Sequence, residues 1–202
     1  MKLQEKQDGK DRVSGVTIAK VDENRKPLEE TRQYISCDTL LLSVGLIPEN
    51  ELSKCAGIGL DRITNGAVVD QDRATEIDGI FACGNVLHVH DLVDFVSQEA
   101  EIAGKSAAAY ILGKCKKDVN IALKTDGRIR YTVPQKITAN KDVNVYFRVA
   151  DVFCNVHINV YNGEKLIYSK KKKKAAPGEM ESIVLKKEIF AGAEELYFAL
   201  EG

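Results

Sequence analysis

The amino-acid sequence predicts an α/β domain followed by an all-β domain. In residues 75–112 a short apolar run, Gly79–Cys83, is followed by Gly84-Asn85 and then by small or apolar residues spaced three and four apart. That order is typical of a strand, a glycine turn and a helix. From residue 121 onward the apolar residues recur with period two instead, which indicates strands. We therefore predict domains at 1–118 and 119–202, joined by the charged stretch 114–120.

The helix after the glycine turn is predicted from one apolar face. Asp91 or Asp94 is placed to cap its first turn, and Gly113 to end it in a left-handed conformation. The residues expected on the buried face are Val93, Val96, Ala100, Ala103, Ala107 and Ile111.

The beginning of the chain predicts further strands. Residues 13–21 and 28–36 alternate loosely between apolar and polar, with a turn-prone segment between them, so they predict a hairpin. The unbroken apolar run Thr39–Val44 is typical of a strand covered on both faces in a mostly parallel sheet.

The second domain is predicted to be a small antiparallel sandwich, immunoglobulin-like in general architecture. Val143, Val145, Phe147 and Val149 share one face of a strand, and Asn144, Tyr146 and Arg148 share the other. Further strands are expected around residues 156–160, 166–168, 183–185 and 196–200. Asn162-Gly163 is a strong signal for a hairpin turn.

Composition excludes some classes of protein. Lys and Arg number 29 against 30 Asp and Glu, so no overall charge favours nucleic acid or an anionic membrane. No apolar run approaches the length of a membrane helix and the N-terminus is polar, which predicts a cytoplasmic protein. The five cysteines show no Cys-x-x-Cys spacing, so neither a disulfide framework nor a zinc ribbon is indicated.

Three ordered blocks of the sequence resemble one known family. They are Cys37–Asn50, which ends in Gly45-Leu46-Ile47-Pro48-Glu49-Asn50, then Gly66–Asp70, then Thr75-x-x-x-x-Ile80-Phe81-Ala82-x-Gly84-Asn85. Together they are similar to the C-terminal part of pyridine nucleotide-disulphide oxidoreductase-type flavoproteins. The segment Cys83-Gly84-Asn85 with His88-Val89-His90-Asp91 resembles the branch found beside anaerobic glycerol-3-phosphate dehydrogenases.

The resemblance implies a partial Rossmann-like domain that contributes to an FAD site, with NAD or NADP as co-substrate. Gly84 and Asn85 would contact the ribityl-pyrophosphate part of FAD, and the helix start at Asp94 and Phe95 would face the isoalloxazine ring. Asn85 stands where the family usually has Asp, so it keeps hydrogen-bonding capacity without the charge. No residue of the chain is assigned as a catalytic acid, base or nucleophile.

Such a flavoprotein normally also carries Gly-x-Gly-x-x-Gly turns, and this sequence has none. The nearest match, Gly57–Arg62, is interpreted as a surface loop. We therefore expect a C-terminal fragment that lacks an N-terminal FAD/NAD(P)-binding region, is inactive alone and forms no stable FAD complex. The alternative is a non-catalytic interaction module in which the sandwich docks a partner subunit or a second copy.

Three features allow more than one interpretation. His88, His90, Asp91 and Asp94 are compatible with a metal ion, with a place beside flavin or substrate, or with simple loop hydrogen bonding, and we assign no metal. Cys83 is compatible with a redox role but is interpreted as a buried strand residue. Lys170–Lys174 is compatible with nucleic acid or acidic lipid, but is interpreted as a solvated loop or edge strand.

Overall fold

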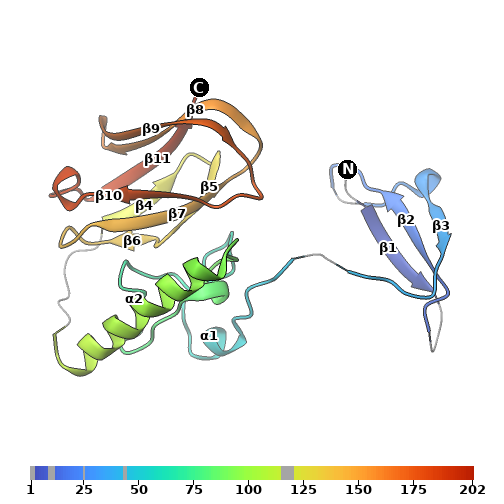
Figure 1. Cartoon of the computed structure of the whole chain (residues 1–202), viewed down its shortest axis with the longest axis horizontal. Helices are drawn as coiled ribbons and strands as arrows, with labels where there is room; N and C mark the ends of the chain where they lie inside the picture. The colour runs from blue at the N-terminus through green and yellow to red at the C-terminus, as the bar shows by residue number, and fades with distance from the viewer. Residues whose placement is uncertain (1–2, 9–11, 25, 43–44, 115–120) are drawn as a thin grey trace. The chain divides into compact units, whose positions relative to one another are not determined.

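The structure is a computed structural model that describes residues 3–8, 12–24, 26–42, 45–114 and 121–202 (Figure 1). The chain forms two compact units, Met1–Gly45 and Leu46–Gly202. The domain boundary predicted near residue 118 lies outside the described residues. The division at that point stays a prediction.

The first unit is a three-stranded antiparallel sheet. Its strands are β1 (Leu3–Asp8), β2 (Gly15–Lys20) and β3 (Gln33–Ser36), in the order β1-β2-β3, with a short 3-10 helix η1 (Glu29–Thr31) before β3. Gly15 pairs with Ser36 and Ile18 with Gln33. The hairpin predicted between residues 13–21 and 28–36 is therefore confirmed.

The buried strand predicted at Thr39–Val44 is wrong in its described part, residues 39–42. These residues form no strand, and Leu41 is 90% and Leu42 64% exposed. A strand covered on both faces needs hydrogen-bonded neighbours at its edges and packed layers above and below it. The described residues provide neither to this run.

The second unit combines helices and loops with a two-sheet sandwich. The helical elements are α1 (Glu51–Cys55), the 3-10 turn η2 (Gly84–Val86), α2 (Val93–Ile111) and η3 (Lys187–Ile189). The strands are β4 (Ile121–Thr125), β5 (Ile129–Val133), β6 (Lys136–Ile137), β7 (Val143–Val149), β8 (Phe153–Asn162), β9 (Lys165–Ala175), β10 (Glu181–Leu185) and β11 (Glu195–Glu201). One sheet has the order β10-β7-β5, and the other β6-β4-β11-β8-β9.

Alternation along the strands builds the sandwich core, as the sequence predicts. The inward residues Val145, Phe147 and Val149 of β7 are fully buried, and Val156, Ile158 and Val160 of β8 face them in the same cluster. The β8–β9 hairpin turns at Asn162-Gly163, with Gly163 at φ +56°. The sandwich departs from an all-antiparallel arrangement because β11 pairs with β4 in parallel. The immunoglobulin-like architecture stays a prediction.

The five lysines Lys170–Lys174 lie in β9, which is the edge strand of the five-stranded sheet. This confirms the interpretation of the run as an edge strand. Lys172 turns toward the neighbouring sheet, where its Nζ lies 2.7 Å from Glu181.

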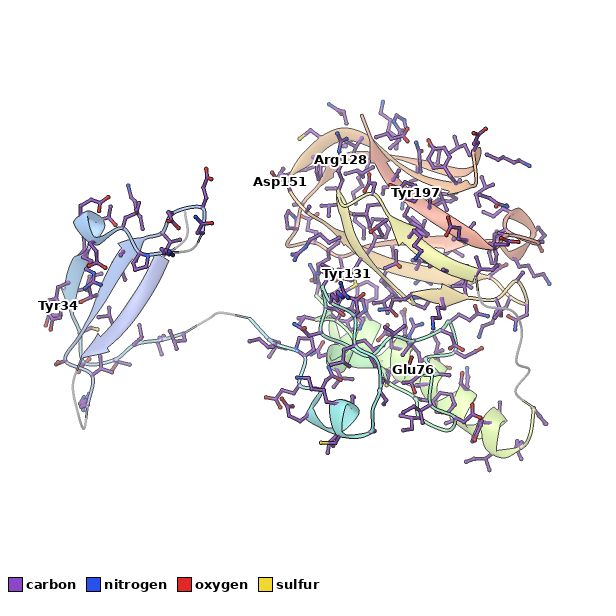
Figure 2. All side chains as sticks on the ribbon, turned by 180° about the vertical axis from the view of Figure 1, so that it is seen from behind. Tyr34, Glu76, Arg128, Tyr131, Asp151 and Tyr197 are labelled. Carbon is purple, nitrogen blue, oxygen red and sulfur yellow. The ribbon has the colours of Figure 1, made fainter. Side chains whose placement is uncertain are left out.

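The outer face of the β10-β7-β5 sheet packs against residues 58–87. Tyr131 and Val133 of β5 share a small apolar cluster with Ala67 and Leu87, and Tyr131 lies at this boundary in Figure 2. Gln135 extends the contact, because its backbone N–H donates to the Val69 carbonyl and its Oε1 accepts from the Val69 N–H.

The strand predicted at Gly79–Cys83 does not form. Only Phe81 makes a bridge, to Ala74. The chain reverses direction in a tight turn at Gly79, whose φ is +81°. Its backbone groups therefore bond residues nearby in sequence, as when the Thr75 N–H donates to the Ile80 carbonyl at 2.9 Å. No room remains for a longer ladder.

Helix α2 forms as predicted, but its buried face is different. Val93 and Ile111 are 74% and 82% exposed, whereas Glu99 is completely buried. Of the six residues expected inside, Ala103 is buried. The apolar spacing misplaces the face because α2 packs its middle onto a polar cluster in which Glu99 has partners for its charge.

The ends of α2 gave one wrong and one confirmed prediction. Neither aspartate caps the start, because Leu92 occupies the cap position without a side-chain bond. At the other end Gly113 adopts φ +66° and the Lys114 N–H donates to the Ala109 carbonyl at 2.9 Å, the expected left-handed termination. In the part of the chain that the structure describes, no helix combines the length and apolarity needed to cross a bilayer.

Candidate functional site

Asn50 joins the sequence blocks that carried the family resemblance. It is 3% exposed, and its Nδ2 donates to the Asn65 carbonyl at 2.9 Å and to the Val86 carbonyl at 2.8 Å. The Ser53 hydroxyl in turn donates to Asn50 Oδ1 at 3.0 Å. The amide is thus bonded at both ends, and it ties the end of the first block to the residue just before the second block and to the residue just after the third.

The later blocks also meet through their backbones. A Cβ atom added at Gly66 would lie 1.9 Å from the carbonyl oxygen of Leu87, a separation that no larger residue tolerates. Glycine is therefore required at position 66 for the second block to approach Leu87, two residues after the third block.

A pocket of about 440 Å³ opens beside this junction. Volumes of about 300–1,000 Å³ are usual for small-molecule sites. Its walls come from α1 and the two residues before it, from the loop that leads into η2, and from the last residue of η2. The residues that line it are Glu49, Asn50, Glu51, Leu52, Ser53, Phe81, Ala82, Cys83 and Val86.

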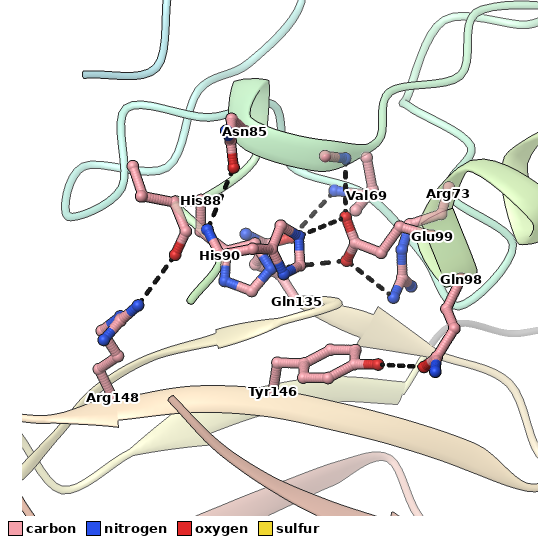
Figure 3. A network of polar contacts seen from close by, with 12 residues as sticks. Val69, Arg73, Asn85, His88, His90, Gln98, Glu99, Gln135, Tyr146 and Arg148 are labelled. Atoms are coloured by element: carbon pink, nitrogen blue, oxygen red, sulfur yellow. Dashed lines mark hydrogen bonds and ion pairs between the residues drawn. The ribbon is translucent and has the colours of Figure 1, made fainter. Parts of the chain in front are cut away.

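Behind the η2 turn lies a buried carboxylate, Glu99 of α2, at the centre of a polar cluster (Figure 3). Its Oε2 accepts the Gly84 N–H at 2.8 Å and lies 3.1 Å from His90 Nε2. Its Oε1 lies 3.1 Å from Arg73 Nη2 and 3.5 Å from His88 Nε2. The Arg73 and Glu99 side chains are 1% and 0% exposed, so this is a fully buried ion pair.

Two opposing effects set the charge of Glu99. Burial alone would raise the pKa of a carboxyl group. Here the hydrogen bonds from His88 and His90 and the charge of Arg73 outweigh it, so the pKa of Glu99 lies far below its usual value. Glu99 is therefore a carboxylate, and Arg73 balances its charge.

His88 is held neutral in this cluster. Burial lowers its pKa, and the attraction of Glu99 offsets this only in part. His88 is 1% exposed, its Nε2 lies 3.5 Å from Glu99 Oε1, and its Nδ1 has no hydrogen-bond partner among the described residues. A neutral His88 imidazole therefore lies beside the ion pair of Arg73 and Glu99, whose two charges balance.

His88, His90 and Glu99 are grouped closely enough to hold a metal ion, since their ligand atoms lie within 4.8 Å of one another. Arg73 opposes metal binding, because its guanidinium already pairs with the Glu99 carboxylate and would repel a cation. Water does not screen this repulsion in a buried site. Within the described part of the chain, the ring Nδ1 atoms of both histidines also lack the hydrogen-bond acceptors that usually orient metal ligands. The geometry favours an internal ion pair, and the absence of a metal stays a prediction.

The residues predicted to bind a cofactor lie close together but play different parts. Gly84 is buried at φ +75° with its N–H directed inward to Glu99. Asn85 is exposed, and its Oδ1 accepts the His90 N–H at 3.1 Å. Asp94 is exposed in the first turn of α2, while Phe95 is half-buried with its ring centroid 5.8 Å from that of Tyr146.

The sequence suggested that Cys83 is a buried strand residue, and the structure shows that it is not. It is half-buried beside the pocket, at the residue that precedes η2. Burial, followed by the charge of Glu99, raises the pKa of its thiol, which disfavours the reactive thiolate.

The sandwich contributes Arg148 to this site, and the sequence did not predict that contact. Arg148 of β7 donates from Nη2 to the Val89 carbonyl at 3.0 Å and to Asp91 Oδ1 at 2.5 Å. The other Asp91 oxygen accepts the Met180 N–H at 2.6 Å. The period-two pattern had placed Tyr146 and Arg148 on the outer face of β7, but nothing in the sequence indicated that this face covers the histidine loop.

The family of the chain follows from a comparison with known protein families. The sequence profile of the pyridine nucleotide-disulphide oxidoreductases matches residues 3–107, just over half of the 202 residues. The chain belongs to this family. Pyridine nucleotide-disulphide oxidoreductases generally bind FAD and NAD(P), with a Rossmann-like fold for these cofactors. No curated protein matches the chain at a significant level.

The family match covers the junction at Asn50, the pocket walls and the Glu99 cluster, and it ends within α2. It does not extend to the sandwich, from which Arg148 reaches the histidine loop. In this member of the pyridine nucleotide-disulphide oxidoreductase family, the pocket and the Glu99 cluster are therefore built from residues within the family match. The contact that holds the histidine loop comes from Arg148, outside the match.

Proposed function

We propose that the chain is the C-terminal part of an FAD-dependent, NAD(P)H-linked oxidoreductase and supplies one wall of its flavin site. One observation carries the proposal: the pocket of about 440 Å³ is lined jointly by residues of the Gly45–Asn50 block and of the Thr75–Asn85 block. These are the blocks that the family resemblance assigns to the cofactor region.

The described residues fit part of a flavin rather than all of it. Leu52, Phe81 and Ala82 give the pocket an apolar wall suited to a ring system. The bound cofactor would accept a hydride from nicotinamide, while the protein holds and orients it and limits access of water. Asn50 keeps the two walls together, and Gly84 keeps the turn behind them against Glu99.

We propose that an FAD/NAD(P)-binding region covers the apolar side chains left exposed near the pocket. Ile47 is 75% and Leu52 87% exposed, and both belong to the segment that the family places next to the nucleotide domain. Clusters of exposed large apolar residues mark surfaces that pack against something else. With that cover absent, we expect only weak and reversible flavin binding and no oxidoreductase activity.

The test is a titration of the ¹⁵N-labelled 202-residue chain with FAD, followed by heteronuclear NMR. We expect fast-exchange shifts at the amides of Phe81–Val86 and of α1. Ala82→Leu, which fills the pocket, should abolish them. Ala56→Leu adds the same side chain at an exposed residue outside the lining, and it should leave them unchanged. Shifts spread over the surface, or equal in both variants, would rule out this pocket as the flavin site.

A further inference from the structure

The edge strand β9 has one side that no described strand pairs with. It is 11 residues long and comes last in the sheet order β6-β4-β11-β8-β9 (Figure 1). In an antiparallel pair, alternate residues direct their N–H and C=O groups to the neighbour, and the residues between them direct theirs away from it. The open side of β9 therefore offers a row of donors and acceptors with which another strand can pair. The opposite edge offers far less, because β6 has only two residues.

The open edge of β9 is positively charged. It contains the run Lys170–Lys174, in which only Lys172 has an ion-pair partner among the described residues, Glu181 at 2.7 Å. The other four lysines are exposed. None of the β8 residues that pair with this stretch is acidic, and they are Cys154, Val156, His157 and Ile158. The neighbouring strand therefore leaves the charge of the edge uncompensated.

Both faces of the edge carry this charge. Lys172 turns toward the neighbouring sheet. Because side chains alternate along a strand, Lys171 and Lys173 lie on the outer face instead, while Lys170 and Lys174 share the face of Lys172. Side chains on the same face of a strand repeat about every 7 Å, and a strand laid beside β9 would have the same repeat. Acidic side chains of an added strand can therefore meet the lysines position by position.

The sign of the charge decides which strand can be added. Two copies of this chain paired edge to edge would place lysines opposite lysines, and like charges directly opposite each other are destabilising. An acidic strand makes the interaction attractive at the same positions. Nucleic acid would also meet the charge, but single strands are bound by stacking on aromatic side chains as well, and none lies between Ser169 and Ala175. Only a polypeptide strand uses both the charges and the row of backbone groups.

We propose that the open edge of β9 binds an extended, acidic segment of a partner protein, which adds to the sheet as a further strand opposite Lys170–Lys174. Strand addition of this kind takes its affinity from main-chain hydrogen bonds and its specificity from side chains. Here the specificity comes from charge. The edge lies outside the family match, which ends at residue 107, so the inference does not depend on the proposed flavin site.

The experiment uses the ¹⁵N-labelled 202-residue chain and a synthetic peptide of about eight residues in which glutamate and threonine alternate. We expect this peptide to slow amide exchange with solvent at every second residue between Lys170 and Lys174, because only those N–H groups face the added strand. A peptide with proline in place of threonine has the same charge but cannot form a ladder. It should bind at least about tenfold more weakly, which corresponds to about 1.4 kcal/mol.

Two double variants separate the charge of the edge from the charge of the whole chain. Lys171→Glu with Lys173→Glu should weaken binding of the glutamate peptide at least about tenfold, and should allow the corresponding lysine peptide to bind instead. Lys124→Glu with Lys187→Glu makes the same change in net charge at exposed residues of β4 and η3, and should leave the affinity nearly unchanged.

Several results would overturn the proposal. The edge is only a charged patch if the threonine and proline peptides bind equally well, or if the glutamate peptide binds without protecting alternate amides of β9. Tighter binding of single-stranded oligothymidylate than of the glutamate peptide would assign the edge to nucleic acid instead. No binding of the glutamate peptide, or equal losses in the two double variants, would refute the proposal as well.

Discussion

Arg73 Nη2 lies 3.1 Å from Glu99 Oε1, and neither side chain is more than 1% exposed. The two residues come from different elements, a tight loop and the middle of α2, and Arg73 adopts an unusual positive φ of +63°. A charge removed from water is tolerated only when its partner is present. The loop and the helix are therefore interdependent.

Breaking this pair should destabilise the protein strongly. Glu99→Gln keeps the shape of the side chain but leaves Arg73 as an uncompensated buried charge, so we expect the free energy of unfolding to fall by about 3–5 kcal/mol. Urea denaturation of the purified variant measures this. Glu101→Gln on the exposed face of the same helix is the control, and it should leave the free energy of unfolding nearly unchanged. Similar losses in both variants would contradict a special role for the buried pair.

Stability should decrease as the pH falls below neutrality. The folded pKa of His88 is lowered by burial, so below its ordinary value of 6.5 the unfolded chain binds a proton that the folded chain does not. Stability rises with pH wherever the unfolded state binds more protons, so it is lost as pH falls through this range, with a slope of up to about 1.4 kcal/mol per pH unit. Glu99, whose folded pKa is also lowered, adds a loss below its ordinary value of 4.5.

Urea titrations at a series of pH values between 7 and 4 test the sign. His88→Gln should flatten the curve between about pH 6.5 and 5, since it removes the titrating group. His157→Gln makes the same exchange at an exposed residue of β8 and is the variant against which the His88 curve is compared. A curve that rises toward acid pH would be inconsistent with a His88 that is neutral when folded.

Asn50→Asp should separate the family blocks. The substitution preserves size but replaces the NH₂ donor by an oxygen, which then faces the carbonyls of Asn65 and Val86. Two lost hydrogen bonds with unpaired buried acceptors predict a destabilisation of about 3 kcal/mol. Ser53→Ala removes only the bond to the other end of the amide, so about 1 kcal/mol is expected. Equal effects in thermal or urea unfolding would speak against the joining role of Asn50.

Arg148→Met should release the histidine loop from the sandwich. It removes the bonds to the Val89 carbonyl and to the Asp91 carboxylate, and the expected cost is about 2 kcal/mol. Hydrogen exchange at residues 88–91 should accelerate, while exchange in the sandwich core stays slow. Arg130→Met on the exposed side of β5 provides the comparison. Loop exchange that is insensitive to Arg148 would show that the sandwich does not hold the loop.

Cobalt binding tests whether Arg73 excludes metal. We expect the natural chain to take up no stoichiometric Co²⁺. Arg73→Gly, which suits the left-handed backbone at this position, should bind Co²⁺ at least about tenfold more tightly, because a buried positive charge beside the ligands has been removed. Absorption bands of cobalt that require His88 and His90 would confirm the ligands. Tight stoichiometric Co²⁺ binding by the natural chain would overturn the assignment of an internal ion pair.

Local sequence patterns correctly predicted the elements that are determined by residues close together in the sequence. The alternation in Val143–Val149, the Asn162-Gly163 turn and the termination at Gly113 each depend on neighbours within a few residues, and all three appear in the structure. The apolar run Thr39–Val44 did not become a buried strand in its described part. An apolar run indicates that a segment needs packing partners, but it does not show that these partners exist, and the described residues do not supply them.

The polar cluster was predictable only in part. His88 and His90 were recognised, since two histidines one residue apart draw attention. Glu99 was not, because helical periodicity treats a charged residue as solvent-facing, and its partner Arg73 is distant in sequence. The contribution of Arg148 was equally hidden, because no local pattern shows that the sandwich closes over this loop. Gly84 and Asn85 were located from family likeness, and their hydrogen-bond partners came from the structure.

The parallel pairing of β4 with β11 has a consequence for synthesis. β11 follows all the other described strands in sequence, and it lies between β4 and β8 in the middle of its sheet. During synthesis, β4 and β8 must each wait with one unpaired edge until β11 emerges from the ribosome. Folds that depend on contacts between residues far apart in sequence form slowly, and their unpaired strand edges can aggregate in the meantime. We therefore expect the two unpaired edges, on β4 and β8, to be prone to aggregation during synthesis until β11 has been made and fills the gap between them.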